Sequence, residues 1–564
     1  MKPAIFILGP SALPVAQKIK DMLKGEIHGP KDVDGVDVVF DKAIDAIARS
    51  FVARQPIFGI CATAILIRAV GRHLRDKQSE PPVLAVAEDG SMVVPLLGGH
   101  HGGNHLARNI AEALQGTAAI TTASDVIFGQ SFDEPEDGYT LGNPEHMKTA
   151  TSAKLRGEEI EVVKTIHPEQ GSDRKIVLHP HVLTVGIGCE RGTSSKEIRT
   201  LIKDTLLEHN LSHLAVATYA SIDLKENETA LSELLLVKFF TAKELAAQSD
   251  KIENPSPYVE ETVGTPSVAE AAALAAAGPD AKLIVPKTKS KRATIAIAQA
   301  PEPITVYPGK WRGHVSVVGI GPGNRMTRSE EMIFQLAMAT DWVGYDLYLN
   351  LIHDLRSEQA EHRFPLGDEE ARCRHAIELA KQGKRVALVC SGDAGIYAMA
   401  ALVYELIDRE PNRIAVEVHP GISAFQAASA RAGAMIGHDF CCISLSDLLT
   451  PWEVIEKRVK AAAEGDFVIS FYNPRSLKRR DQLEWAFAIL KSHRPPETPV
   501  VIATNLGRPE EKTKIVRFDE FDPEDVDMLT LVMVGSSQSR SFQRGDGRTY
   551  AYTPRGYAKK MDAR

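Results

Sequence analysis

The sequence predicts an α/β protein that is built from several open sheets. Short apolar runs alternate with helical patterns over residues 1–125 and again over residues 182–298, which is typical of sheets with mostly parallel strands. A third region begins at residues 314–320, where a buried strand runs into a glycine turn. The length of 564 residues suits about three or four domains.

The composition excludes several classes of protein. Hydrophobic residues make up 44% and charged residues 25%, which is ordinary for a globular protein, and the net charge of −8 argues against a nucleic-acid binder. None of the six cysteines forms a C-x-x-C pair, so a zinc or iron–sulfur site has little support and a reducing cytoplasm is expected. No run approaches the roughly 20 apolar residues of a membrane helix, and the short apolar run at the start suits a first strand rather than a signal peptide.

The first region, residues 1–125, is predicted to alternate between strands and helices in an open sheet. The expected strands are 4–8, 57–60, 83–86, 92–95 and 118–122, and the expected helices are 12–23, 62–74 and 105–114.

A loop at residues 98–104, with the sequence Gly-Gly-His-His-Gly-Gly-Asn, is the unusual feature of this region. It joins an expected strand to an expected helix, which is where open α/β sheets bind ligands. Glycines on both sides of His100 and His101 permit the close approach of a large ligand. The alternative is a turn with solvated histidines, and a metal site is disfavoured because no third ligand is evident.

Residues 126–181 are expected to form a small middle module or a lid, and regular alternation resumes at residue 182. After a strand and a glycine turn, Ser194 or Ser195 suits the N-cap of a helix. The free N–H groups at the start of this helix, together with Arg191, could bind a carboxylate; the alternative is that the serine only caps the helix. An alanine-rich helix is expected at 268–277, and a strand from 283 is expected to end in a basic loop that reaches residue 292.

These front modules resemble the cobalt-precorrin-5A hydrolase family. The resemblance rests on residues 98–104, 121–125, 186–193, 220–225 and 285–289, and it spans nearly all of residues 1–298. The family usually has Ser-Gly-His-x-Gly-Gly, whereas this sequence begins the stretch with Gly-Gly-His-His; the histidine of the pattern, His100, is retained. The resemblance implies opening of a lactone ring with loss of acetaldehyde. His100 is then the candidate base, with His101 or Glu88 assisting; the alternative is a front half that binds a tetrapyrrole without catalysis.

Residues 299–313 are rich in proline and are predicted to be a linker. The strand and turn that follow have glycines at 319, 321 and 323 with Pro322 between them. This is not the dinucleotide fingerprint, because Asn324 stands at the place of the third glycine and Pro322 lacks the N–H that a pyrophosphate needs. The turn therefore indicates either a ligand site without a phosphate cradle or only a tight exit from the strand.

Four stretches in this region resemble the tetrapyrrole (corrin and porphyrin) methyltransferase family over residues 314–542. They are the glycine turn, Ser-Gly-Asp-x-x-x-Tyr at 391–397, Pro-Gly-x-Ser-Ala at 420–424 and the strand that ends in Asn-Pro at 473–474. Residues 470–476 and 505–510 are most similar to the precorrin-3B C(17)-methyltransferases. The resemblance implies a two-lobed fold with a hinge near 425–440, S-adenosylmethionine as cofactor and tetrapyrrole substrates. The residues that it implies for the cofactor are Gly321, Pro322, Gly323, Gly392, Asp393, Ile396, Ser423, Ala424, Tyr472, Asn473, Val534 and Gly535.

Some assignments in the rear part have alternatives. Asp393 also suits a helix N-cap. The subfamily implies ring contraction with a proton transfer, for which His438 and Asp439 are the candidate acid and base. Residues 543–564 are expected to be a mobile basic tail. We also expect a homodimer through the methyltransferase part.

Overall fold

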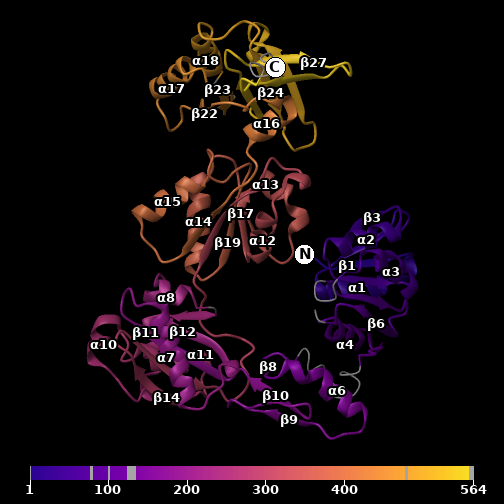
Figure 1. The fold of residues 1–564 in the computed structure, drawn as a ribbon, viewed down its shortest axis with the longest axis vertical. Coiled ribbons are helices and arrows are strands. Elements are labelled where there is room, and N and C mark those ends of the chain that lie inside the picture. Colours follow the sequence, from indigo (N-terminus) through magenta and orange to yellow (C-terminus); the bar gives the residue numbers. More distant parts are fainter. Residues whose placement is uncertain are drawn as a thin grey trace.

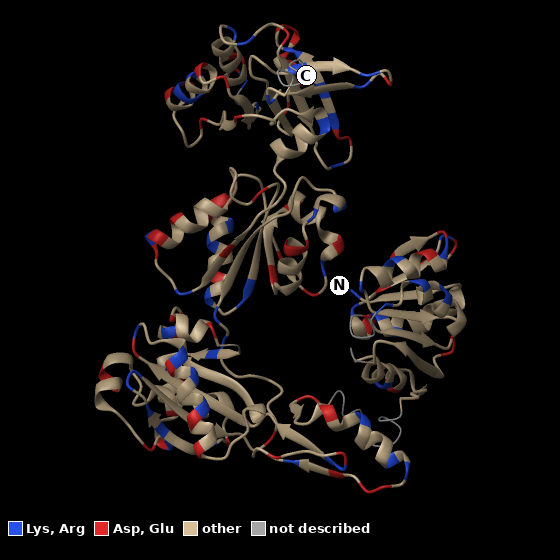
Figure 2. Cartoon of the chain, viewed as in Figure 1, with Lys and Arg blue, Asp and Glu red and all other residues tan. Residues whose placement is uncertain are grey.

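The computed structural model describes residues 2–75, 80–99, 102–122, 135–234, 236–476 and 480–557. It confirms an α/β protein with several separate sheets, which follow one another along the chain (Figure 1). Lysine and arginine are interspersed with aspartate and glutamate, mostly on the helices and loops around the sheets (Figure 2). Within the described ranges, every helix is too short or too polar to cross a membrane.

The first sheet has seven strands in the order β3-β2-β1-β4-β5-β6-β7, covered on its two faces by separate apolar cores. Its strands are parallel except that β6 runs antiparallel to β5. The expected strands at 57–60 and 83–86 are confirmed, whereas β2, β3 and α2 were not predicted. The strands are β1 (Ala4–Ile7), β2 (Glu26–Pro30), β3 (Val38–Phe40), β4 (Ile57–Ile60), β5 (Val83–Val86), β6 (Met92–Leu97) and β7 (Thr117–Ala118), and the helices are α1 (Leu13–Leu23), α2 (Ala43–Val52), α3 (Thr63–Val70) and α4 (Gly103–Leu114).

The middle module has a three-stranded sheet in the order β8-β10-β9 with one helix packed on it. Its elements are β8 (Tyr139–Leu141), α6 (Met147–Leu155), β9 (Glu161–Lys164) and β10 (Lys175–Pro180).

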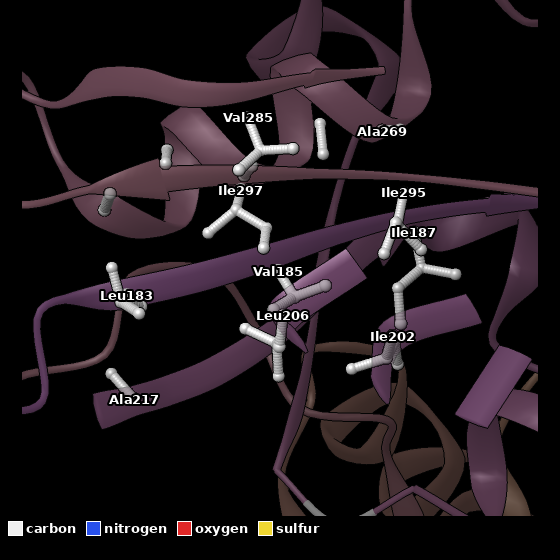
Figure 3. Packing of buried hydrophobic residues seen from close by; sticks show 14 of the residues in the cluster. Leu183, Val185, Ile187, Ile202, Leu206, Ala217, Ala269, Val285, Ile295 and Ile297 are labelled. Carbon is white, nitrogen blue, oxygen red and sulfur yellow. The ribbon is translucent and has the colours of Figure 1, made fainter. Parts of the chain in front are cut away.

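The next sheet has the order β13-β12-β11-β15-β14. Apolar side chains of its central strands, such as Val185 and Ile297, pack against α7 on one face (Figure 3). On the other face α11 lies directly on Gly186, where a Cβ atom would come within 1.9 Å of the Ala269 carbonyl oxygen. The elements are β11 (Leu183–Cys189), α7 (Ser195–Glu208), β12 (Val216–Ile222), α8 (Thr229–Ser232), β13 (Val237–Phe240), α9 (Ala242–Ala246), α10 (Pro257–Val263), α11 (Val268–Ala277), β14 (Lys282–Lys289) and β15 (Ala293–Gln299).

Two local expectations change in this unit. Strand β14 continues through Lys289, so Lys287 and Lys289 belong to the strand and the basic loop is shorter than predicted. Residues 300–310, which were expected to be a linker, pack against the unit. Ile304 is only 7% exposed in its core, and Lys310 exchanges two backbone hydrogen bonds with Phe239. Proline prevents regular structure there, but it does not prevent packing.

The first lobe of the rear part has a five-stranded, fully parallel sheet in the order β18-β17-β19-β16-β20. Because all strands are parallel, the turns that follow them lie along one edge. Its elements are β16 (His314–Gly319), α12 (Glu330–Met338), β17 (Asp341–Tyr345), α13 (Asp346–Leu351), β18 (Ala360–Phe364), α14 (Glu369–Lys381), β19 (Arg385–Cys390), α15 (Ala400–Arg409) and β20 (Ala415–His419).

The second lobe has a mixed sheet in the order β22-β23-β26-β24-β25 and a small sheet in the order β21-β28-β27. Helix α16 packs in a core with the second sheet, so the chain crosses between the lobes at residues 420–423, before the predicted hinge at 425–440 (Figure 1). Its elements are α16 (Ala424–Ala432), β21 (Gly433–Ala434), β22 (Phe440–Ser444), α17 (Trp452–Glu464), β23 (Val468–Tyr472), α18 (Gln482–Leu490), β24 (Pro499–Thr504), β25 (Lys512–Arg517), β26 (Thr530–Val534), β27 (Arg540–Gln543) and β28 (Thr549–Tyr552).

The expected mobile tail from residue 543 is wrong for its first part. Strand β28 pairs with both β21 and β27, and Ala551 is fully buried. Thr553 donates to the Met435 carbonyl oxygen at 2.6 Å. Residues 558–564 lie outside the described part of the chain.

Candidate functional site

Three of the quoted motifs meet at the carboxyl edge of the first-lobe sheet. The turn after β16 and the turn after β19 are joined by a two-residue bridge, in which the Gly321 N–H donates to the Gly392 carbonyl at 3.1 Å and the Gly392 N–H donates to the Gly321 carbonyl at 2.8 Å. Both glycines have a positive φ, +71° and +66°, which disfavours other residues there. The local sequence therefore sets two strand exits that lock together.

The third motif packs against these two turns through backbone alone. A Cβ atom on Gly421 would lie 2.2 Å from the Gly392 oxygen and 2.6 Å from the Gly319 oxygen. By contrast, a Cβ atom on Gly392 would have only ordinary contacts of 3.9–4.0 Å with residues 422–424. The glycines at 319 and 421 thus serve packing, while Gly392 leaves space in front of the start of α16.

Asp393 ties the second motif to the third. Its Oδ1 accepts from the Gly395 N–H at 2.8 Å and its Oδ2 accepts from the Gly421 N–H at 3.2 Å. The interpretation of Asp393 as a helix N-cap is wrong, because α15 begins at Ala400 with Met399 as its N-cap. The carboxylate instead fixes the backbone around the gap in front of Gly392.

Two tyrosines, Tyr472 of the second lobe and Tyr397 of the first, lie next to each other where the lobes meet. The Tyr472 hydroxyl accepts from the Phe425 N–H at 3.3 Å, and its ring lies 5.1 Å from that of Tyr397. Tyr397, on the first-lobe loop, donates to the Cys442 carbonyl at 2.9 Å and so connects the lobes. Burial raises the pKa of both tyrosines, so both hydroxyls are neutral at physiological pH.

The remaining implied residues of the third motif and of β23 lie beside this pair. Ser423 is the N-cap of α16 and forms a capping box with Gln426, and Ala424 is the first residue of the helix. Ile396 packs against the second-lobe core. Asn473 has a left-handed backbone and donates from its amide to the Ser444 hydroxyl at 3.2 Å, at the end of β22.

Val534 and Gly535 do not lie at the expected cofactor site, because of the direction in which their strand runs. Strand β26 runs antiparallel to β23, so Val534 pairs with Ile469 at the end of the sheet remote from Tyr472. Val534 is fully buried, and the Gly535 N–H donates to the Pro499 carbonyl. The residue of β26 at the edge that carries Tyr472 is Thr530, which pairs with Thr504.

His438 and Asp439 precede β22, at the opposite end of that strand from Ser444. Both side chains are exposed, and His438 Nδ1 lies 3.0 Å from Asp439 Oδ2 and accepts from the Asp439 N–H at 2.8 Å. The structure therefore does not bring them together with the glycine turns and the tyrosines.

Two residues of the site were missed as candidates from the sequence. Tyr397 stands in the quoted Ser-Gly-Asp-x-x-x-Tyr motif, which was the available signal. Arg508 stands in the quoted stretch 505–510, which nothing had connected to the cleft. The loop after β24 places Gly507 against Pro322 and Arg508 against Gly323, so it covers the first glycine turn from the second lobe.

The front half gives a different result. His100 and His101 lie outside the described residues, but their flanks show where the loop begins and ends. Because β6 is antiparallel to β5, Leu97 pairs with Val83, and a Cβ atom on Gly98 would lie 2.4 Å from Pro82 Cα. The loop therefore leaves the sheet at the amino end of β5.

Glu88, the residue expected to assist His100, follows the carboxyl end of β5. It accepts from the Ser11 hydroxyl at 2.7 Å and lines a cavity of about 530 Å³ with Leu8, Ile60 and Cys61. Glu88 and the described start of the histidine loop, Gly98, thus leave the sheet at opposite ends of β5, which does not support the expected pairing. Burial raises the pKa of the Cys61 thiol to about 11, so it is not a ready nucleophile.

The turn after β11 is a self-contained cap. The Ser194 hydroxyl accepts from the Glu197 N–H, which confirms Ser194 as the N-cap of α7. The Gly192 N–H donates to Glu228, and Arg292 donates to the carbonyl oxygen of Arg191. The Gly192 N–H and the Arg292 side chain at the expected carboxylate site are therefore already bonded to other groups of the protein.

Three family models of known proteins match stretches of this chain. The family model for tetrapyrrole (corrin/porphyrin) methylases matches residues 314–522, and the models for the cobalamin synthesis G N-terminal region and C-terminus match residues 45–125 and 183–298.

Similar individual proteins match the rear part. A probable cobalt-factor III C(17)-methyltransferase of Salmonella typhimurium is 44% identical over 243 residues, covering 43% of this chain and 99% of the relative. A precorrin-3B C(17)-methyltransferase of a Sinorhizobium species is 41% identical over 249 residues, covering 44% and 98%. The crystal structure of the methyltransferase CobJ is 39% identical, covers 43% of this chain and 100% of that chain, and has a TM-score of 0.41.

Proposed function

Because this chain belongs to the tetrapyrrole (corrin/porphyrin) methylase family and also carries both cobalamin synthesis G regions, we propose that it is a bifunctional enzyme of cobalamin biosynthesis. The rear part methylates C(17) of precorrin-3B, or of its cobalt form, with S-adenosylmethionine and contracts the ring. The front part opens the lactone of cobalt-precorrin-5A and releases acetaldehyde. Near-complete coverage of two C(17)-methyltransferases is the observation that carries the first activity.

The residues of the cleft suit a reaction that depends on positioning. The cofactor supplies a methyl group with its own leaving group, so the protein needs chiefly to hold two reactants in line. The bridged turns at Gly321 and Gly392, fixed by Asp393, form a rigid wall for this purpose. The junction of these turns with residues 422–424 at the start of α16, where a Cβ atom on Gly392 would have contacts of 3.9–4.0 Å, is the proposed place of the cofactor.

Tyr472 of the second lobe and Tyr397 of the first lobe are proposed to close the cofactor site where the two lobes meet. Their hydroxyl groups bond to backbone, which leaves the ring faces to exclude water from the reacting groups. The proton transfer of ring contraction has no assigned residue, because His438 and Asp439 are exposed and pair with each other.

For the front part, His100 is proposed as the base that activates water, without help from Glu88. A non-catalytic tetrapyrrole-binding front part is the second candidate function. The separation of Glu88 from the histidine loop favours it, because it removes the expected partner of the base.

One experiment tests these activities together. The purified chain is incubated with S-adenosylmethionine and precorrin-3B or its cobalt form, and separately with cobalt-precorrin-5A, and the products are identified by mass. The proposal requires a methylated, ring-contracted product in the first mixture and acetaldehyde in the second. Methylation without acetaldehyde selects the binding module, and no methylation of either form removes the first activity. Sedimentation of the same sample tests the expected homodimer.

A further inference from the structure

Arg508 crosses from the second lobe to the carboxyl edge of the first-lobe sheet. Its Nη2 donates to the Ser391 hydroxyl at 3.1 Å, directly beside the Gly392 turn. Its aliphatic part packs on Gly323, where a Cβ atom would lie 3.2 Å from Arg508 Cγ. The loop that carries it is itself fixed, because the Glu511 carboxylate accepts from the Gly507 N–H at 2.7 Å and pairs with Arg431.

The guanidinium of Arg508 is under-used by the protein. Its Nε is buried and has no hydrogen-bond partner, and its Nη2 donates to the neutral hydroxyl of Ser391 rather than to a carboxylate. Arg508 as a whole is half-buried, but a buried guanidinium nitrogen without a hydrogen-bond partner is costly, and such groups in proteins are normally paired. This arrangement indicates that an external anion completes the site.

A second arginine adds to the positive charge behind this edge. Arg372 is only 3% exposed; it donates to the Pro365 carbonyl at 3.1 Å and contacts the Met399 sulfur at 3.5 Å, and its Nε is likewise buried without a partner. Burial raises the pKa of Tyr348, while the charges of Arg508 and Arg372 oppose that shift. Tyr348 therefore lies within the electrostatic reach of both arginines.

The sheet order places this charge on one side of the cleft. Tyr348 follows β17, whereas residues 420–424 follow β20, and β17 and β20 lie on opposite sides of the β19–β16 pair. Ser423 and Ala424 of the proposed cofactor site thus lie toward α16, and Tyr348 lies toward α13, while Arg508 reaches the central turns at Ser391 and Gly323. Two ligand positions along one edge suit a reaction with two reactants.

We propose that Arg508 binds a carboxylate side chain of the tetrapyrrole substrate and so positions the ring in front of the methyl group. Precorrins carry several acetate and propionate groups, and a guanidinium binds carboxylates through charge-assisted hydrogen bonds. Ser391 orients the guanidinium through its hydroxyl, and Arg372 adds to the positive potential near Tyr348. This inference rests on the substrate class of the proposed function and adds a specific subsite to it.

The test uses the full chain, with Arg508→Gln and Arg508→Lys as variants. Arg517→Gln is the matched control, because Arg517 lies on β25 of the same lobe and pairs with Asp519 on the surface. Calorimetry measures binding of cobyrinic acid, of its fully esterified form and of S-adenosylmethionine, and thermal unfolding checks that each variant is folded. A charge-assisted bond predicts that Arg508→Gln weakens cobyrinic acid binding about 10- to 100-fold.

Further measurements show whether a loss of affinity comes from the lost contact with the substrate carboxylate. Arg508→Lys is expected to retain part of the affinity, the ester is expected to bind weakly to every variant, and affinity for S-adenosylmethionine is expected to stay within about twofold. With precorrin-3B as substrate, KM is expected to rise in Arg508→Gln with little change in kcat.

Four results would overturn the subsite. If Arg508→Gln loses as much affinity for S-adenosylmethionine as for cobyrinic acid, Arg508 binds the cofactor carboxylate instead. The subsite is also overturned if Arg517→Gln loses the same affinity for cobyrinic acid, if Arg508→Gln binds cobyrinic acid unchanged, or if the wild-type chain binds acid and ester equally. These binding measurements need no turnover. The subsite can therefore fail while methylation of precorrin-3B is observed, and it can stand where methylation fails.

Discussion

Gly321 and Gly392 bond to each other through both of their backbone amides, and this bridge joins the two strand exits that form the wall of the cleft. Asp393, the next residue, extends the connection to Gly421. The wall therefore depends on three turns at once, and a change in one is expected to affect the others.

Asp393→Ala is expected to weaken S-adenosylmethionine binding at least about tenfold while the fold stays intact. The change removes two acceptors of backbone N–H groups that shape the gap in front of Gly392, and hydrogen bonds to charged groups contribute about 1.5–3 kcal/mol each. Calorimetry on the full chain measures this, with Asp408→Ala on the exposed face of α15 as the control. Unchanged affinity would remove Asp393 from the site.

Gly421→Ala is expected to be far more disruptive than most glycine substitutions. The new Cβ atom would meet two carbonyl oxygens at 2.2 and 2.6 Å, both on backbone that cannot move without opening the bridged turns. Overpacking of this kind costs about 1–3 kcal/mol or more, and each kcal/mol lowers Tm by roughly 2–4 °C in a domain of this size. Gly545→Ala, which meets no atom within 4 Å, is the control in thermal unfolding. Equal Tm values for the two variants would contradict the packing argument.

Two buried cysteines are expected to make the first lobe sensitive to alkali. Burial raises the pKa of the Cys373 and Cys390 thiols to about 12, from an ordinary value of 9.0. The folded state thus prefers the neutral thiols; their contribution to stability is complete below pH 9 and is lost as pH rises from 9 toward 12.

Urea unfolding of wild type and Cys390→Ala at several pH values between 8 and 11 tests this expectation. The difference in unfolding free energy between the two proteins is expected to shrink above pH 9, by at most about 1.4 kcal/mol per pH unit. A difference that stays constant with pH would show that the thiol does not titrate on unfolding. In the folded protein both thiols are expected to resist iodoacetamide at pH 8.

His100→Ala is expected to reduce acetaldehyde release from cobalt-precorrin-5A by about 10²–10⁴-fold, the usual contribution of a general base, without affecting methylation. His101→Ala is expected to reduce it less, because that position departs from the family pattern. His105→Ala is the control, since His105 lies on α4 and bonds to Asn109. Equal loss of methylation in His100→Ala would mean that the two halves share one site, and wild-type protein that binds this substrate without releasing acetaldehyde would select the binding module.

The rear part is expected to fold and bind S-adenosylmethionine when it is produced alone from residue 313. Its cores contain only residues from 315 onward, so no apolar partner is removed. The front part is expected to need residues up to 311, because Ile304 and Lys310 pack on it and Lys238 lies 3.8 Å from the centre of the Trp311 ring. Solubility and Tm of chains ending at 299 and at 311 measure this; aggregation of the 313–564 piece would contradict the division.

The sequence by itself determined those features that depend on near neighbours along the chain. The α/β class, the strands Ile57–Ile60 and Val83–Val86, the helix Val268–Ala277 and the cap at Ser194 follow from apolar periodicity and local hydrogen bonding. Strands β2 and β3 escaped prediction because one ends in Gly-Pro and the other has only three residues.

Only the tertiary structure decided which strand ends share an edge, because strand direction depends on pairing between distant segments. The antiparallel direction of β6 separates the histidine loop from Glu88, and that of β26 takes Val534 away from Tyr472. The same kind of long-range packing brings Arg508 of the second lobe to Ser391 of the first. No local pattern encodes these placements, since each depends on how two separately formed sheets or lobes dock.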